Sequence, residues 1–207
     1  MNDRLNGAVP GALPDRERLA DALLHGDRAA VSALMETGNR QRLVRWKDKI
    51  MSELTSQYLA GSIPFCQLTA VSQAAMPLCC AEDAPVACCG AVAGNTSAIG
   101  QNYMMMLLRA WGVPAISLGT DTAVDAFLQS VARYGLRFVI CVVFCDTDIA
   151  FIRQLDAEAR RRKLRERFCL LLSGFCPEQS TLASLPVDCP DSRAAAAAEW
   201  VVRTWKG

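Results

Sequence analysis

Histidine is almost absent from this chain: its 207 residues include one, His25. Ser-His-Asp triads and Cys-His pairs both need an imidazole base beside the nucleophile. His25 lies in an early helical region, where we expect a surface or helix-end position rather than a role as a metal ligand. The sequence therefore predicts no independent hydrolytic or transferase chemistry of that kind, and we assign no catalytic residue.

Long apolar runs and an excess of one charge are also missing. The 22 Lys and Arg residues balance 21 Asp and Glu residues, for a formal charge of +1, which argues against broad binding to nucleic acid or to an anionic membrane. No run approaches the roughly 20 apolar residues that cross a bilayer. The polar start, residues 1–4, lacks the apolar centre of a signal peptide. We expect a cytoplasmic protein with neither nucleic-acid nor membrane partners.

Cysteine, by contrast, is plentiful, with ten residues. Most lie in apolar runs such as residues 139–143, and without an export signal they are expected to be reduced and buried. The pairs Cys79-Cys80 and Cys88-Cys89 lack the Cys-x-x-Cys spacing of zinc sites. We interpret them as small core residues rather than as metal ligands.

The spacing of apolar residues divides the chain into four parts. Residues 1–14 contain Pro and Gly without an apolar period and are expected to form an N-terminal arm. In residues 15–80 apolar side chains recur at helical spacing, which predicts a helical domain. Residues 81–85 resemble a linker, and residues 86–207 form the second domain.

The second domain alternates short apolar runs with longer amphipathic segments, which is typical of an α/β protein with a parallel sheet. Its predicted strands lie near residues 86–92, 115–118, 138–144, 168–172 and 186–188. Its predicted helices cover residues 99–111, 122–134, 148–163, 177–184 and 191–205. This rhythm fits a flavodoxin-like, doubly wound, five-stranded sheet, in which ligands bind beyond the carboxyl ends of strands one and three.

The loop after the first predicted strand is the first place to look for a site. It reads Gly94-Asn95-Thr96-Ser97-Ala98-Ile99-Gly100-Gln101-Asn102. Glycine permits a close approach of the backbone, and Asn, Thr and Ser cap helix starts. From these residues alone, the loop is either a polar ligand-binding loop or an ordinary strand-to-helix turn.

This loop resembles the Gly-Asp-x-His-x-x-Gly-Lys-Asn motif of corrinoid proteins, whose His ligates cobalt. Gly94, Ile99, Gly100 and Asn102 match the family. The Asp, His and Lys positions differ and hold Asn95, Ser97 and Gln101. In the family the Asp orients the ligating His, so the two replacements are interpreted as coordinated.

The resemblance extends over about residues 15–205. The segment Leu118-Gly119-Thr120-Asp121 is similar to the end of the family's second strand, and Ser173-Gly174 stands where a Gly-Gly pair follows strand four. Val142 replaces a Ser of strand three. Residues 22–27 and 58–63 resemble the helical cap that covers the upper corrin face in methyltransferase-associated corrinoid proteins.

The resemblance implies a helical-bundle cap on residues 15–80 and a cobalamin-binding site on the second domain. The residues implied under the lower corrin face lie in the loop after the first predicted strand: Gly94, Asn95, Thr96, Ser97, Ile99 and Gly100. Those implied around the nucleotide tail are Leu118, Gly119, Val142, Ser173 and Gly174. Cobalamin would bind without a protein His on cobalt, and no residue is expected to ligate metal.

By this resemblance the chain is a methyl-carrier protein, not an autonomous enzyme. It would present a corrinoid to a partner methyltransferase or activating protein, and a homo-oligomer is also compatible with it. One alternative is a scaffold or regulatory domain that has lost corrinoid binding. Another is a flavin-binding module, in which Thr96 and Ser97 at a helix N-terminus would hold phosphate, but the loop lacks the full Ser/Thr-rich cradle.

Overall fold

The computed structural model describes residues 15–78, 84–174 and 179–207. The first part is helical throughout, as its apolar spacing predicts. Side-chain caps start two of its helices: Asp27 accepts the backbone N–H of Ala30 at 3.0 Å, and Asn39 accepts that of Arg42 at 3.1 Å. The helices of this helical segment are α1 (Asp15–Leu24), α2 (Arg28–Thr37), α3 (Arg40–Leu59), α4 (Phe65–Ala74) and the short η1 (Met76–Leu78).

The second part is α/β. Its four strands form one parallel sheet in the order β2-β1-β3-β4. The strands are β1 (Ala87–Val92), β2 (Ala115–Thr122), β3 (Phe138–Val143) and β4 (Cys169–Gly174). The two central strands, β1 and β3, are buried along their whole length, which explains their unbroken apolar sequences.

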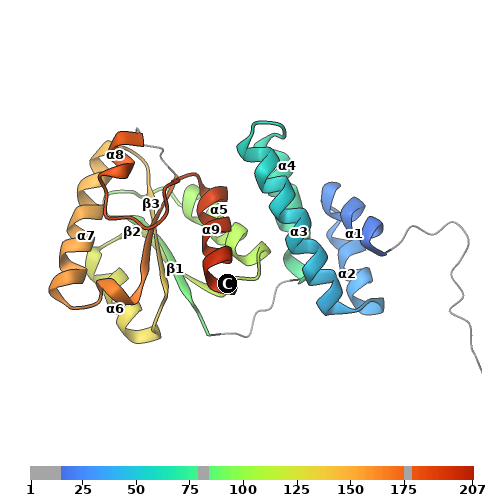
Figure 1. Ribbon diagram of the computed structural model, residues 1–207, viewed down its shortest axis with the longest axis horizontal. Coiled ribbons are helices and arrows are strands. Elements are labelled where there is room, and N and C mark those ends of the chain that lie inside the picture. Colours follow the sequence, from blue (N-terminus) through green and yellow to red (C-terminus); the bar gives the residue numbers. More distant parts are fainter. Residues whose placement is uncertain (1–14, 79–83, 175–178) are drawn as a thin grey trace, which may run out of the picture.

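Helices cover both faces of the sheet (Figure 1). α5 and α9 lie on one face, and α6 and α7 lie on the other. The helices of this part are α5 (Ile99–Ala110), α6 (Val124–Tyr134), α7 (Ile149–Arg161), α8 (Gln179–Ala183) and α9 (Ala194–Lys206), with short turns η2 (Asp146–Asp148) and η3 (Arg165–Arg167). The predicted two-sided wrapping of a parallel sheet is therefore confirmed.

The predicted fifth strand, near residues 186–188, is wrong. Pro186 has no N–H to donate to a ladder, and the segment makes a single backbone bond to β4, from Asp188 N–H to the Leu170 carbonyl at 2.8 Å. The Asp188 carboxylate takes the place of a strand carbonyl and accepts the Leu170 N–H at 2.7 Å. β4 is consequently the edge strand of the described sheet.

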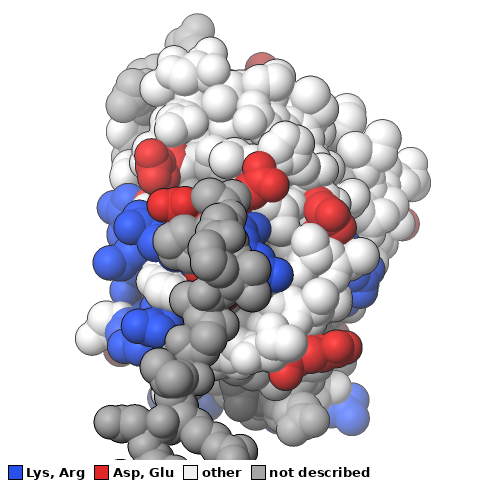
Figure 2. All heavy atoms as spheres, turned by 90° about the vertical axis from the view of Figure 1, so that its right-hand side faces the viewer, with Lys and Arg blue, Asp and Glu red and all other residues white. Residues whose placement is uncertain are grey.

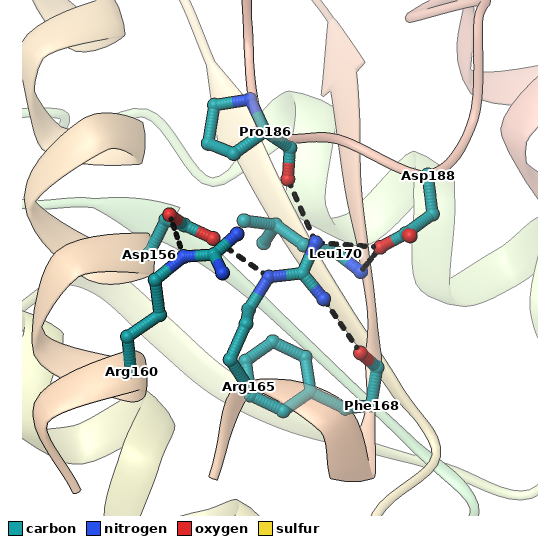
Figure 3. Close-up of polar contacts among 7 residues, drawn as sticks. All are labelled: Asp156, Arg160, Arg165, Phe168, Leu170, Pro186 and Asp188. Carbon is teal, nitrogen blue, oxygen red and sulfur yellow. Dashed lines mark hydrogen bonds and ion pairs between the residues drawn. The ribbon is translucent and has the colours of Figure 1, made fainter. Parts of the chain in front are cut away.

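A side-chain cluster holds this segment against β4 (Figure 3). The Arg165 guanidinium donates to the Pro186 carbonyl at 2.8 Å and to Asp188 at 3.0 Å. Its Nε donates to Asp156 of α7 at 2.7 Å, and its Nη1 donates to the Phe168 carbonyl at 3.0 Å. One arginine therefore supplies the cross-links that a fifth strand would have supplied through its backbone.

The helical segment packs on the α5 and α9 side of the sheet. One continuous apolar core joins α1–α4 to α5, α9 and that face of the sheet. Lys47 of α3 is fully buried, and its ammonium donates to the Ala110 carbonyl at the end of α5 at 2.7 Å. Lys206 of α9 reaches Asp48 of α3 at 2.6 Å. Both apolar and charged contacts therefore fix the two parts against each other.

Figure 2 shows the end of the molecule formed by the helical segment, where basic and acidic side chains both lie on the visible face. This mixture agrees with the formal charge of +1. Within the described ranges, no helix combines the length and the apolar character needed to cross a membrane.

Candidate functional site

The loop after β1 lies where the chain switches between the two faces of the sheet. The connection after β1 leads to α5 on one face, and the connection after neighbouring β3 leads to α7 on the other. In doubly wound sheets the crevice beyond the strand ends at this point is the usual ligand site. The observed strand order therefore puts residues 93–98 at the expected position.

Asp121, at the end of β2, anchors this loop. Its carboxylate accepts the Gly94 N–H at 2.7 Å, and its own N–H donates to the Asn95 carbonyl at 2.9 Å. Asp121 and Gly94 both have positive φ, 51° and 86°. The reciprocal bonds hold Asp121 in a backbone conformation that is uncommon outside glycine. The sequence did not single out Asp121 as a site residue.

Asn95 and Gln101, two of the three departures from the corrinoid motif, face the protein interior. Asn95 is buried, and its Oδ1 accepts the Ser97 N–H at 3.0 Å. Its Nδ2 is buried without a hydrogen-bond partner. Gln101 is also buried, and it donates to the hydroxyl of Ser117 on β2. Both side chains therefore help to shape the loop and the start of α5.

The remaining loop residues are more accessible. Ser97 is half-buried, Thr96 is exposed, and 78% of Ile99 is exposed. A Cβ added to Gly94, or to Gly119 at the end of β2, would meet no atom within 4 Å. The surface of the loop is therefore open, with apolar Ile99 on its rim.

Val142 fills the space between α5 and the end of β4. Its Cγ1 lies 2.8 Å from the position that a Cβ on Gly100 would occupy, and 3.7 Å from the corresponding position on Gly174. Val142 is buried and pairs with Ser173 across β3 and β4. The structure thus brings three predicted tail residues, Val142, Ser173 and Gly174, together beside Gly100 but leaves little room between them.

Leu118 does not join this group. Its side chain packs with the core on the α6 and α7 side, whereas Val142 packs with the core on the α5 and α9 side. Residues two apart on a strand share a face, and Ile116 and Leu118 both pack with the core on the α6 and α7 side. The sheet therefore separates Leu118 from the other predicted tail residues.

Two hydroxyls near the end of β4 have no hydrogen-bond partner. Ser173 and Ser192 are fully buried, and the Oγ of each is unsatisfied. The Gly174 N–H donates to the Ser192 carbonyl at 3.0 Å, which ties the end of β4 to the residues before α9. Buried unsatisfied hydroxyls are uncommon in proteins and can mark a place where an absent ligand would donate or accept.

Aromatic side chains connect the loop to the helical segment. Tyr103 lies one turn after Ile99 on α5, so both face the same side of the helix. The ring centroid of Tyr103 is 4.6 Å from that of Phe65 on α4, and Phe65 is 6.4 Å from Tyr58 of α3. Half of Phe65 is exposed. The sequence analysis included Tyr58 in the segment that resembles the helical cap, but it did not predict that Phe65 and Tyr103 would pair.

Several cysteines are buried as the sequence predicts, but Cys66 and Cys145 are exposed, against that prediction. Cys88 and Cys89 are fully buried, and burial raises the thiol pKa of both, that of Cys88 to about 12. Cys79 and Cys80 lie outside the described residues. His25 is exposed just after α1, and its Nδ1 lies 3.1 Å from an Asp21 carboxylate oxygen.

The sequence matches no model of a known protein family and no curated protein. Solved structures do match over nearly the whole chain. A cobalamin-binding protein from Desulfitobacterium hafniense DCB-2 has a TM-score of 0.78 and 17% identity, with 94% of this chain and all of that chain covered. The methanol:cobalamin methyltransferase complex MtaBC from Methanosarcina barkeri has a TM-score of 0.72 and 16% identity, with 93% and 80% covered.

A third match is the monomethylamine corrinoid protein of Methanosarcina barkeri, with a TM-score of 0.54 and 17% identity, covering 90% of this chain and 96% of that one. These likenesses include both the helical segment and the sheet. The chain therefore has the fold of corrinoid proteins.

Proposed function

We propose that this protein binds a corrinoid at the carboxyl end of its sheet and acts as a methyl carrier for a partner methyltransferase. The main support is the agreement of two independent observations: a corrinoid-protein fold over more than 90% of the chain, and an open, apolar-rimmed loop at the switch point of that fold. When bound, the corrinoid supplies a cobalt centre that accepts and donates a methyl group.

The residues at the sheet edge suit a flat macrocycle. Open space lies beside Gly94 and Gly119, where any larger side chain would protrude. Ile99 and, at the end of β3, Phe144 expose 78% and 60% of their surfaces. Exposed apolar surface of this kind is typical of a binding site. In our proposal these residues bury the macrocycle, and Phe65 and Tyr103 border it on the side of the helical segment.

The same residues do not suit a protein ligand to cobalt or a deeply inserted tail. Ser97 holds the position of the ligating His, and its hydroxyl is a poor substitute for imidazole. Val142 occupies the space between Gly100 and Gly174. We therefore propose that cobalamin binds with its own base, or water, as the lower ligand, and that its tail stays largely outside the sheet.

Reconstitution tests this proposal. Purified protein is mixed with hydroxocobalamin under oxidising and reducing conditions, free ligand is removed by gel filtration, and the visible spectrum is recorded. We expect retained corrin absorbance with the spectrum of base-on cobalamin. Absence of retained absorbance under both conditions would contradict the proposal and favour a scaffold or regulatory domain that has lost the cofactor.

Two variants test the lower ligand and the tail. The double variant Asn95→Asp with Ser97→His should change the retained spectrum to that of a His-ligated cobalt, while Ser184→His, on an exposed turn, should leave it unchanged. Val142→Ser should strengthen cobalamin binding relative to cobinamide, which lacks the nucleotide tail. If Val142→Ser strengthened the binding of cobalamin and of cobinamide equally, the proposed position of the nucleotide tail would be contradicted.

A further inference from the structure

A groove of about 700 Å³ runs between α4 and α5, from the start of α5 to Arg109 in its last turn. Residues of α4 spaced by four form one wall, and residues of α5 spaced by three or four form the other. Ser117 of β2 lies between them. The described residues that line the groove are Phe65, Thr69, Gln73, Asn102, Tyr103, Met105, Met106, Arg109 and Ser117. Its volume is that of a site for a small organic molecule.

The lining is apolar on two sides. Phe65 contributes an aromatic ring from α4, and Met105 and Met106 contribute flexible thioether side chains from α5. Methionine adapts to ligands of different shape. Amides and hydroxyls of Gln73, Asn102 and Thr69 lie among them. Such a surface suits a ligand with an apolar body and few polar groups.

The charge in the groove has one sign. Arg109 lines it, and none of its described lining residues is acidic. No hydrogen bond or ion pair connects the Arg109 guanidinium to another described residue. An arginine fork binds a carboxylate with two parallel hydrogen bonds. An unpaired guanidinium beside apolar walls therefore favours an organic anion.

Tyr103 adds an unused polar atom. Its Oη is buried without a hydrogen-bond partner. Burial raises the pKa of Tyr103, so the hydroxyl keeps its proton at neutral pH and can donate. A ligand oxygen in the groove would satisfy a group that costs free energy while it is unpaired.

We propose that this groove binds a small organic carboxylate with an apolar body. The carboxylate lies on Arg109, and the body lies between Phe65 and Met106. The groove follows α5 to Arg109 in its last turn, whereas residues 94–98 of the loop stand before its first turn. Phe65 and Tyr103 border both the groove and the proposed corrinoid site, but Arg109 belongs to the groove alone, so carboxylate binding does not require a bound corrinoid.

Calorimetry and ligand-observed NMR on the corrinoid-free full chain test the proposal. The probes are octanoate and 3-phenylpropionate, with 1-octanol and 3-phenylpropanol as uncharged counterparts. We expect both carboxylates to bind more tightly than the matching alcohols. Arg109→Gln should weaken carboxylate binding about tenfold, the factor for losing roughly 1.4 kcal/mol, and leave alcohol binding unchanged. Arg153→Gln, an exposed arginine on α7, is the matched control.

A second pair of variants tests the location. Met106→Trp and Thr69→Trp fill the groove from opposite walls and should each abolish binding of all four probes, and thermal unfolding shows which of them are folded. Absence of carboxylate binding at millimolar concentrations would overturn the proposal. It would also be overturned if a folded tryptophan variant bound normally, or if Arg109→Gln and Arg153→Gln had equal effects. Corrinoid retention is measured separately, so neither result decides the other.

Discussion

Replacing Arg165 by Met should destabilise the protein strongly, because one guanidinium holds the segment that stands in place of a fifth strand. The Arg165 side chain is 14% exposed and contacts Asp156, Asp188 and two backbone carbonyls. Removing one partner of a buried ion pair typically costs about 3–5 kcal/mol. In the variant, Asp156 would keep Arg160 as a partner, and Asp188 is partly solvated. We therefore expect a loss of stability at the low end of this range, about 3 kcal/mol.

For a protein of this size, about 3 kcal/mol corresponds to a fall in Tm of roughly 6–12 °C. Urea unfolding followed by circular dichroism measures the free energy directly. The control is Arg161→Met, whose side chain is 72% exposed and pairs with Glu158; such surface pairs contribute at most about 1 kcal/mol. If Arg165→Met costs no more than Arg161→Met, the proposed role of the cluster is wrong.

The pH dependence gives a second check on the same cluster. Burial raises the pKa of Asp156, but hydrogen bonds from Arg160 and Arg165 outweigh it, and the net pKa lies below the ordinary value. A carboxylate with a lowered pKa stabilises the fold above its unfolded pKa of about 3.9 and loses that contribution as the pH falls through the folded value. The difference in the free energy of unfolding between wild type and Arg165→Met should therefore become smaller below about pH 4.

Three further predictions concern other parts of the fold. Gly100→Ala should lower the free energy of unfolding in urea by about 1–3 kcal/mol, because its Cβ would lie 2.8 Å from Val142 Cγ1. Adding Val142→Ala to the same chain should remove most of the loss caused by this clash. Lys47→Met should cost about 2 kcal/mol in the same assay, since it leaves the buried Ala110 carbonyl without its donor; an unchanged midpoint would refute the role of Lys47. Iodoacetamide should modify exposed Cys66 and Cys145 in the native protein at pH 8 but not Cys88, whose pKa burial raises to about 12, as peptide mass mapping would detect.

β1, β3 and β4 could be predicted because each is a short, largely buried apolar run, whereas β2, a half-exposed edge strand, was predicted only over its more apolar first half, residues 115–118. The fifth could not be rejected from its sequence alone: Pro186-Val187 is apolar and comes at the right spacing. What replaces it is a side chain twenty-one residues away, Arg165. Contacts of that kind leave no periodic signal in the sequence.

The position of the candidate loop beyond the strand ends could also be predicted, because it follows from strand order. Its internal geometry could not. Asp121 acts through two bonds to the loop that depend on a positive φ, and Phe65 meets Tyr103 only because α4 packs on α5. Leu118 was expected beside Val142, but the alternation of β2 puts it with Ile116 on the face that packs against α6 and α7, and this could have been predicted from the strand pattern. A positive φ and the packing of one helix on another leave no such regular pattern in the sequence.

We interpret Asn95 and Gln101 as residues that suit a loop carrying Ser97 at the position of the corrinoid-motif histidine. A carboxylate at position 95 would be stabilised by an imidazole that it orients; without that imidazole it would be a buried charge with no cationic partner. Asn95 keeps the acceptor that binds the Ser97 N–H and removes the charge. Gln101 likewise lies buried beside Ser117, where an unpaired lysine ammonium would be costly. Neutral residues at positions 95 and 101 therefore suit a loop with Ser at position 97 and preserve the start of α5.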